Sequence, residues 1–203
     1  MRVTRRVALL ATLAAALCLP GVVPVAAQEA TPMASQTAAA AWLDSPTGAW
    51  NTPGMAIPEA RTFEDYAEID CGQQERPAET PQDQALVDAG WHLFAAYQQG
   101  WGVTLVSGLS GYDGMCRPMG YQDFVFVDGE FAGTLAPEPM DSRSDGASDG
   151  ANLWGGDTIS AQYRRYAPDD ALCCPSGSTF VEFTITRGDN GSVVNATLIQ
   201  AAE

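Results

Sequence analysis

The 203-residue chain is strongly acidic, with 25 Asp and Glu residues against 10 Lys and Arg and a formal net charge of −15. Nucleic acid and anionic lipid surfaces are negatively charged, so we expect neither as a partner. Beyond the N-terminus no stretch approaches twenty apolar residues, so we do not expect an integral membrane protein.

The N-terminus has the three parts of a secretory signal. Three arginines fall within the first six residues, Val7–Leu19 is apolar apart from Thr12, and Val25–Ala27 provides small residues for a signal peptidase. We therefore expect residues 1–27 to be a signal peptide, with cleavage after Ala27. The export route, general secretory or twin-arginine, stays open.

The expected mature chain is more acidic than the whole. Of the ten Lys and Arg residues in the full sequence, three lie in the signal, and every Asp and Glu follows it. The mature chain therefore keeps seven cations and 25 acidic groups, a charge of −18. Cys18 is an unconvincing lipidation site, because Ala15 stands where a lipobox has Leu. We expect a secreted or extracytoplasmic protein, in the periplasm or cell envelope.

Residues 28–60 are rich in Ala, Thr, Ser, Gln and Pro and have no hydrophobic period, which is typical of a flexible leader. Trp42 and Trp50 are unusual there; they either dock onto the domain or belong to a linker. Residues 61–203 are then expected to form a single disulfide-stabilised domain.

Four cysteines remain after the signal, namely Cys71, Cys116, Cys173 and Cys174. An even number in an exported chain indicates two disulfides. A bond between the neighbours Cys173 and Cys174 would close a strained eight-membered ring. We therefore expect Cys116 to pair with one of them and Cys71 with the other, with a slight preference for Cys116–Cys174 and Cys71–Cys173. The spacing lacks two short-loop pairs and disfavours a zinc site.

The elements in chain order predict an α+β domain. Leu86, Gly90, Leu93 and Tyr97 repeat at helical spacing and predict one amphipathic helix from Pro81 to about Gly100. Strands follow, and Asp128-Gly129 predicts a tight hairpin turn. The expected strands are 103–106, 121–127, 130–135, 159–166, 179–186 and 193–199. The prediction is an antiparallel sheet of five to six strands with the helix on one face.

Several segments together resemble the LppP/LprE lipoprotein family of actinobacterial envelopes. They are Gly114–Pro118, Phe124–Leu135, Met140 with Ser142-Arg143, Arg165-Tyr166 and above all Leu172–Gly177 with its double cysteine. The similarity extends over about residues 82–187. It implies an envelope-associated or secreted domain with no assigned reaction and no catalytic residues to transfer. Family members are typically lipid-anchored, and this chain lacks a lipobox.

Four motifs are weak candidates for a site. Asp141–Asn152 resembles an EF-hand loop, but Arg143 and Asn152 replace two calcium ligands, so an exposed, mobile, metal-free loop is expected. Ser110 lies in a sequence like a nucleophile elbow that lacks its second glycine. Arg187–Asp189 is an Arg-Gly-Asp tripeptide in a hairpin turn. His92 is the sole histidine, and a structural role is favoured.

Two function classes remain. The favoured one is a non-enzymatic binding or envelope-associated module, whose partner is an unknown envelope component or small ligand. The alternative is a carboxylate-based hydrolase acting on envelope glycans, since paired carboxylates work without histidine. No catalytic residue, cofactor or metal ligand is assigned. Two carboxylates in one pocket, one with a raised pKa, would favour the hydrolase.

Overall fold

The computed structural model describes residues 40–62, 71 and 75–201. The chain divides into two compact units, Met1–Pro32 and Met33–Glu203, and all described residues belong to the second. The expected signal peptide and Cys18 lie outside the described residues. No helix in the described part is long and apolar enough to cross a membrane.

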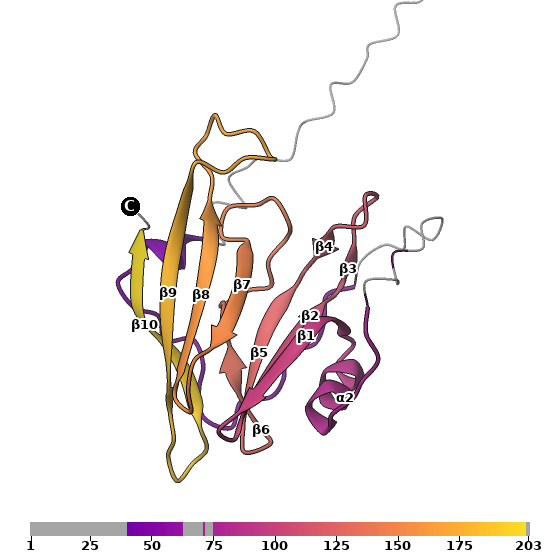
Figure 1. The fold of residues 1–203 in the computed structure, drawn as a ribbon, viewed down its shortest axis with the longest axis vertical. Coiled ribbons are helices and arrows are strands. Elements are labelled where there is room, and N and C mark those ends of the chain that lie inside the picture. Colours follow the sequence, from indigo (N-terminus) through magenta and orange to yellow (C-terminus); the bar gives the residue numbers. More distant parts are fainter. Residues whose placement is uncertain (1–39, 63–70, 72–74, 202–203) are drawn as a thin grey trace, which may run out of the picture. The chain divides into compact units, whose positions relative to one another are not determined.

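The described chain is mostly β, with one short α-helix (Figure 1). Two four-stranded antiparallel sheets have the orders β1-β2-β5-β6 and β10-β9-β8-β7, and β3 pairs with β4. The elements are η1 (Ala41–Asp44), α2 (Pro81–Asp88), β1 (His92–Gly100), β2 (Val103–Leu109), β3 (Gly111–Tyr112), β4 (Pro118–Met119), β5 (Gln122–Val127), β6 (Glu130–Thr134), β7 (Ser148–Leu153), β8 (Thr158–Arg165), β9 (Gly177–Thr186) and β10 (Val193–Ala201).

The six expected strands are all present, but the expectation of one sheet of five to six strands is wrong. Strands β1 and β7 complete two separate four-stranded sheets, which share one hydrophobic core. Side chains such as Val125, Leu105, Ile159 and Phe183 belong to that core and come from both sheets. In β9, buried and more exposed residues alternate, as a strand with one covered face requires.

All six residues of β5 are buried, because both faces of its sheet are covered. One face meets the opposite sheet. The other packs Phe124 and Phe126 against Leu86 of α2 and against Trp91, whose ring lies 4.8 Å from that of Phe124. The helix thus lies on a sheet face as expected, and it covers the middle of this outer face.

The helix is much shorter than the sequence pattern indicated. It ends after Asp88, and His92–Gly100 form strand β1 instead. Gly90 has a φ of +88°, its N–H bonds to Val87 O, and Trp91 N–H bonds to Leu86 O. This pair of bonds is a Schellman motif, in which a left-handed glycine ends the helix. The apolar period that continued past Gly90 belongs to an irregular strand, whose register shifts between Phe94 and Gln98.

From Ala40 onward the expected leader packs on the domain, and Ala40 and Leu43 belong to the core. The first alternative for the two tryptophans is confirmed. The Trp42 ring contacts those of Trp50 and Tyr163 at centroid distances of 4.9 and 5.0 Å. Aromatic contacts of this kind bury a large apolar area.

Candidate functional site

The two sheets differ in their outer faces. The outer face of the β1-β2-β5-β6 sheet is covered by α2 and by Ile57 and Ala60. The outer face of the β10-β9-β8-β7 sheet has exposed apolar side chains, with Trp154 68 %, Phe180 39 % and Leu198 37 % exposed. We call this second surface the open face; it points away from the opposite sheet (Figure 1).

Strand registers place an aromatic ring of the open face between two amides. Phe180 on β9 pairs with Gln162 on β8 and with Gln200 on β10. In the neighbouring row, Glu182 pairs with Ser160 on one side and Leu198 on the other. Phe180 is therefore flanked by amides across the ladder, and Leu198 pairs with a carboxylate.

Trp154 follows β7 and is held against the same face. Its indole N–H donates a 2.7 Å hydrogen bond to the hydroxyl of Ser160, whose side chain alternates outward from Ile159 and Ala161 of the core. The bond fixes the ring direction while most of the side chain stays exposed. A large exposed side chain held in one orientation loses little entropy when it binds a ligand.

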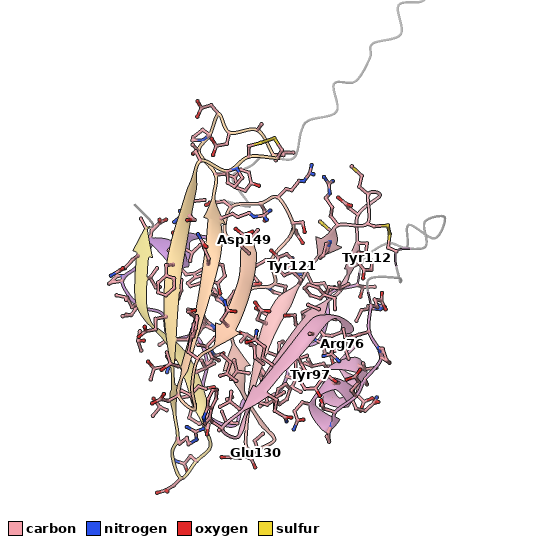
Figure 2. The ribbon with its side chains drawn as sticks, in the orientation of Figure 1. Arg76, Tyr97, Tyr112, Tyr121, Glu130 and Asp149 are labelled. Atoms are coloured by element: carbon pink, nitrogen blue, oxygen red, sulfur yellow. A yellow bond between two sulfur atoms is a disulfide. The ribbon has the colours of Figure 1, made fainter. Side chains whose placement is uncertain are left out.

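The open face carries little charge for so acidic a protein. Among its outward residues on β7 to β10, the charged groups are Glu182 and the ion pair between Arg164 and Asp149. Asp149 is labelled in Figure 2 near the start of β7. Most of the 25 acidic residues lie elsewhere, so this surface suits an uncharged polar ligand.

Among the described residues, Asp123 is the carboxyl whose pKa is raised, and it lies inside the protein. The residue is 4 % exposed, and burial raises its pKa although the Ser107 hydroxyl donates a 2.6 Å hydrogen bond that lowers it. Tyr121 and Tyr163 also have raised pKa values, mainly through burial and secondarily through the charge of Asp123. Tyr121 reaches across to the other sheet and donates to Ser148 O (Figure 2). This buried cluster has a structural role.

Two carboxylates share Arg165 beside a groove of about 410 Å³ next to the edge strand β10. Arg165 donates to Asp145 and Asp44 at 3.0 and 2.9 Å. Burial lowers the pKa of Arg165, but these hydrogen bonds and the two carboxylate charges outweigh it, and the net pKa is raised. A carboxylate pair with a cation between its members is typical of an ion-pair cluster and differs from the acid and base of a glycosidase.

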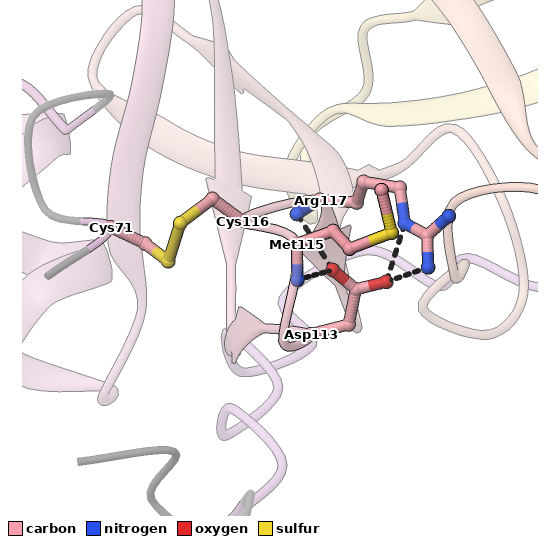
Figure 3. The surroundings of a disulfide bond; sticks show 5 residues. All are labelled: Cys71, Asp113, Met115, Cys116 and Arg117. Atoms are coloured by element: carbon pink, nitrogen blue, oxygen red, sulfur yellow. Dashed lines mark hydrogen bonds and ion pairs between the residues drawn. A yellow bond between two sulfur atoms is a disulfide. The ribbon is translucent and has the colours of Figure 1, made fainter. Parts of the chain in front are cut away.

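The cysteines pair differently from the expectation. Cys71 is bonded to Cys116, with their Cα atoms 5.2 Å apart (Figure 3). Cys173 is bonded to Cys174. The double cysteine is not on an extended segment, because Cys174 N–H bonds to Ala171 O in a turn. Its two side chains therefore do not face opposite sides of a sheet, and the preference for Cys116–Cys174 and Cys71–Cys173 was wrong.

The loop that carries Cys116 is held by Asp113 (Figure 3). The Asp113 carboxylate accepts hydrogen bonds from the backbone N–H groups of Met115 and Arg117 at 2.9 and 3.0 Å, and it pairs with the Arg117 guanidinium. Burial raises the Asp113 pKa, but these bonds outweigh it and the net shift is downward. The disulfide thus ties Cys71 to an ordered hairpin loop.

The segment Asp141–Asn152 is partly strand and partly buried. Ser148–Leu153 form β7, and Ser144, Gly146 and Ala147 are buried, which corrects the expectation of an exposed loop. Asp145 accepts from Arg165 and from Tyr166 N–H, so its carboxylate holds the loop on the sheet. Among the described residues, no group of three or more acidic, His or Cys side chains is placed to hold a metal.

Three further candidates have ordinary positions. Ser110 is buried between β2 and β3, where its hydroxyl donates to Gly120 O and accepts from Arg61 N–H. His92 begins β1, and its exposed ring lies 3.1 Å from Glu75. Arg187–Asp189 lies in the β9–β10 hairpin turn as expected, and Asp189 lines a groove of about 550 Å³ with Glu130 and Phe131. Figure 2 labels Glu130 at this end.

The fold defines an antiparallel two-sheet β protein with one covered and one open outer face. Residues 104–188, which extend from β2 through β9, match the family model described as LppP/LprE lipoprotein. The resemblance found in the sequence is therefore confirmed over this segment, which includes Trp154 and Phe180. No curated protein and no solved structure matches the chain.

Proposed function

We propose that this domain is a non-enzymatic extracytoplasmic binding module whose ligand binds the open face. The family match and the Cys71–Cys116 disulfide support a location outside the cytoplasm. The carrying observation is the contrast between the two sheets, because helix α2 covers one outer face while the other keeps Trp154 and Phe180 in solvent. Exposed aromatic side chains are enriched at binding surfaces.

The hydrolase alternative receives less support. A glycosidase needs a protonated and an ionised carboxyl on either side of the scissile bond. Asp123 has the raised pKa but lies in the core, whereas Asp44 and Asp145 share one arginine. Raised pKa and accessibility thus fall on different residues.

The test is cosedimentation of the purified exported protein with a bacterial cell-envelope fraction. We expect the wild-type protein to sediment and the double variant Trp154→Ala/Phe180→Ala to lose at least about tenfold in affinity, because interface aromatics each contribute about 2 kcal/mol or more. Met115→Ala is the matched control, since Met115 is 69 % exposed but lies in the β3–β4 hairpin loop.

Equal sedimentation of the folded double variant and the wild type would overturn the proposal, with folding checked by circular dichroism. Release of reducing sugar ends from the same envelope fraction by wild-type protein would instead establish the hydrolase. Retained binding of Met115→Ala would show that the effect is specific to the open face and not to exposed apolar groups in general.

A further inference from the structure

The pattern of the open face contains information about its ligand. Protein-binding surfaces gather apolar side chains into a contiguous centre with a polar rim. Here Phe180, on the inner strand β9, has an amide on either side across the ladder, Gln162 and Gln200. The ligand that fits must therefore present apolar and hydrogen-bonding groups at the spacing of single side chains.

Sugar rings have this alternation. A pyranose or furanose ring presents C–H groups on its faces, which stack on aromatic rings, and hydroxyls at its edge, which bond to amides, hydroxyls and carboxylates. Gln162 and Ser178 already form a 2.9 Å hydrogen bond on this face. Such side chains both donate and accept, as a sugar hydroxyl does.

Two aromatic positions can serve more than one sugar unit. Trp154 is bonded to Ser160, which pairs with Glu182, while Phe180 stands two residues earlier on β9. Residues diagonal across an antiparallel pair, such as Ser160 and Phe180, lie about 7–8 Å apart. The rings therefore stand on adjacent rows of one flat face and not in a closed pocket.

The charge distribution selects for a neutral ligand. The chain has a formal charge of −15, whose field repels anionic polymers. The open face offers them only Arg164, already paired with Asp149. A cationic ligand would find many more carboxylates elsewhere on the protein. On this face, the carboxylate without an arginine partner is Glu182.

We propose that the open face binds neutral glycan chains of the cell envelope, with Trp154 and Phe180 stacking on sugar rings and Gln162, Gln200 and Glu182 bonding to their hydroxyls. This inference rests on the proposed function and specifies its ligand. The binding is expected to be insensitive to salt, because no ion pair with the ligand forms.

The test uses glycans released from the envelope fraction and separated by anion exchange into a neutral and an anionic pool. Calorimetry of the exported protein should show binding of the neutral pool. The dissociation constant should change less than about twofold between about 0.05 and about 0.5 M NaCl, a range over which the screening of charges goes from weak to strong. Trp154→Ala should raise that constant at least about tenfold, and Met115→Ala should match the wild type. Trp154→Phe should restore part of the affinity, because it keeps an aromatic ring but loses the hydrogen bond to Ser160.

The possible failures are distinguishable. In the first failure, the neutral pool neither binds the protein nor displaces it from the envelope, and protease treatment of the envelope abolishes sedimentation. The partner is then a protein, so the glycan inference is wrong while the proposed function stands. Preferential binding of the anionic pool would also overturn it. If Trp154→Ala/Phe180→Ala sediments like the wild type, both proposals fall together.

Discussion

Asp83 and Asp123 are both buried carboxylates, and their surroundings give them opposite pKa shifts. Burial raises the pKa of Asp83, but hydrogen bonds from Arg76 and from the backbone outweigh it and the net pKa is lowered. Asp123 has the Ser107 hydroxyl as its hydrogen-bond donor, and burial raises its pKa. An ionised partner therefore decides the charge state that the fold prefers.

Removing the Asp83 charge should be costly. Its two carboxylate oxygens bond to Arg76 at 2.6 and 2.8 Å and to the N–H groups of Glu79 and Thr80. Arg76 also lies 5.2 Å from the Tyr97 ring centroid, beside α2 (Figure 2). We expect Asp83→Asn to lower the free energy of unfolding by about 3–5 kcal/mol in urea titrations, because a buried pair loses one partner.

The matched control for Asp83 is Asp88→Asn. Asp88 ends the same helix, is exposed, and accepts a hydrogen bond from the Gln84 side chain. Exposed pairs of this kind contribute about 0–1 kcal/mol. A loss below about 1 kcal/mol for Asp83→Asn, or an equal loss for both variants, would contradict the structural role of the Arg76–Asp83 pair.

Asp123 should make stability fall as pH rises. The folded pKa is raised above that of the unfolded chain, so the folded state binds the proton more tightly. This contribution is fully present below the unfolded pKa of about 3.9 and is lost as pH rises through the folded pKa. We expect Asp123→Asn to become more stable relative to the wild type as pH rises above about 4.

The comparison of wild type with Asp123→Asn cancels the other carboxylates. Asp83 and Asp113 have lowered pKa values, so their stabilisation is lost as pH falls, the opposite direction. Thermal unfolding of both proteins at several pH values gives the difference directly. A difference that does not change with pH would show that Asp123 has no shifted pKa.

At the scale of elements, one glycine separates a helix from a strand. Gly90 takes a φ of +88° and closes the Schellman motif, and Trp91 then packs beside Leu86 in the cluster under α2. A side chain at Gly90 would meet only the Ala60 Cβ, at 3.5 Å. The requirement for glycine is therefore conformational and not steric.

Gly90→Ala should lower the free energy of unfolding by about 1–2 kcal/mol, the cost of a left-handed conformation for an L-residue. Gly100→Ala is the control, because an added Cβ there meets nothing within 4 Å and its φ is not positive. Urea unfolding of both variants checks this. Equal stability of the two variants would mean that the helix can end without a left-handed residue.

The second prediction at this scale concerns the contribution of the Cys71–Cys116 disulfide to stability. The Cys71–Cys116 bond joins residues 45 positions apart, and in the chain-entropy model such a loop contributes about 4 kcal/mol. The double variant Cys71→Ser/Cys116→Ser should therefore lower the free energy of unfolding by about 4 kcal/mol. The double variant Cys173→Ser/Cys174→Ser is the control, because adjacent residues close almost no loop. Non-reducing peptide mapping should recover Cys71 with Cys116; a peptide joining Cys116 to Cys173 or Cys174 would contradict this connectivity.

At the scale of the whole domain, Asn51 joins the two sheets through side-chain hydrogen bonds. Its amide donates to Thr134 O at the end of β6 and to Val194 O in β10, at 2.9 and 2.7 Å, and its oxygen accepts from Thr134 N–H at 3.0 Å. Gly133 has no side chain and a φ of +130°, and an added Cβ would lie 2.3 Å from Asn51. The segment that carries Asn51 therefore depends on both sheets for its position, and it holds β6 and β10 together in turn.

Asn51→Ala should lower the free energy of unfolding by about 2–4 kcal/mol, because it leaves several buried backbone groups without partners. Asn152→Ala, at an exposed position on the open face, should cost less than about 1 kcal/mol. Chemical unfolding followed by tryptophan fluorescence measures both. Similar losses for the two variants would show that Asn51 does not connect the sheets.

The sequence alone determined the local features of this protein. Six strands and the hairpin at Asp128-Gly129 follow from alternating apolar residues and turn chemistry, and both turn residues have positive φ. The family resemblance rested on short motifs of the same kind. Strand β1 was misread because its bulge breaks the alternation, and β7 because it is a polar edge strand rich in small residues. These signals depend on near neighbours in the chain, which is why periodicity can detect most of them.

Only the tertiary structure decided which distant residues meet. The division of the strands into two sheets, the Cys71–Cys116 pairing and the packing of Trp42 on Tyr163 all join residues far apart in sequence. So does the open face, where Phe180 lies between Gln162 and Gln200 through strand register alone. In one sequence, alternation shows that a strand has two faces, but which face is covered depends on what α2 and the opposite sheet pack against.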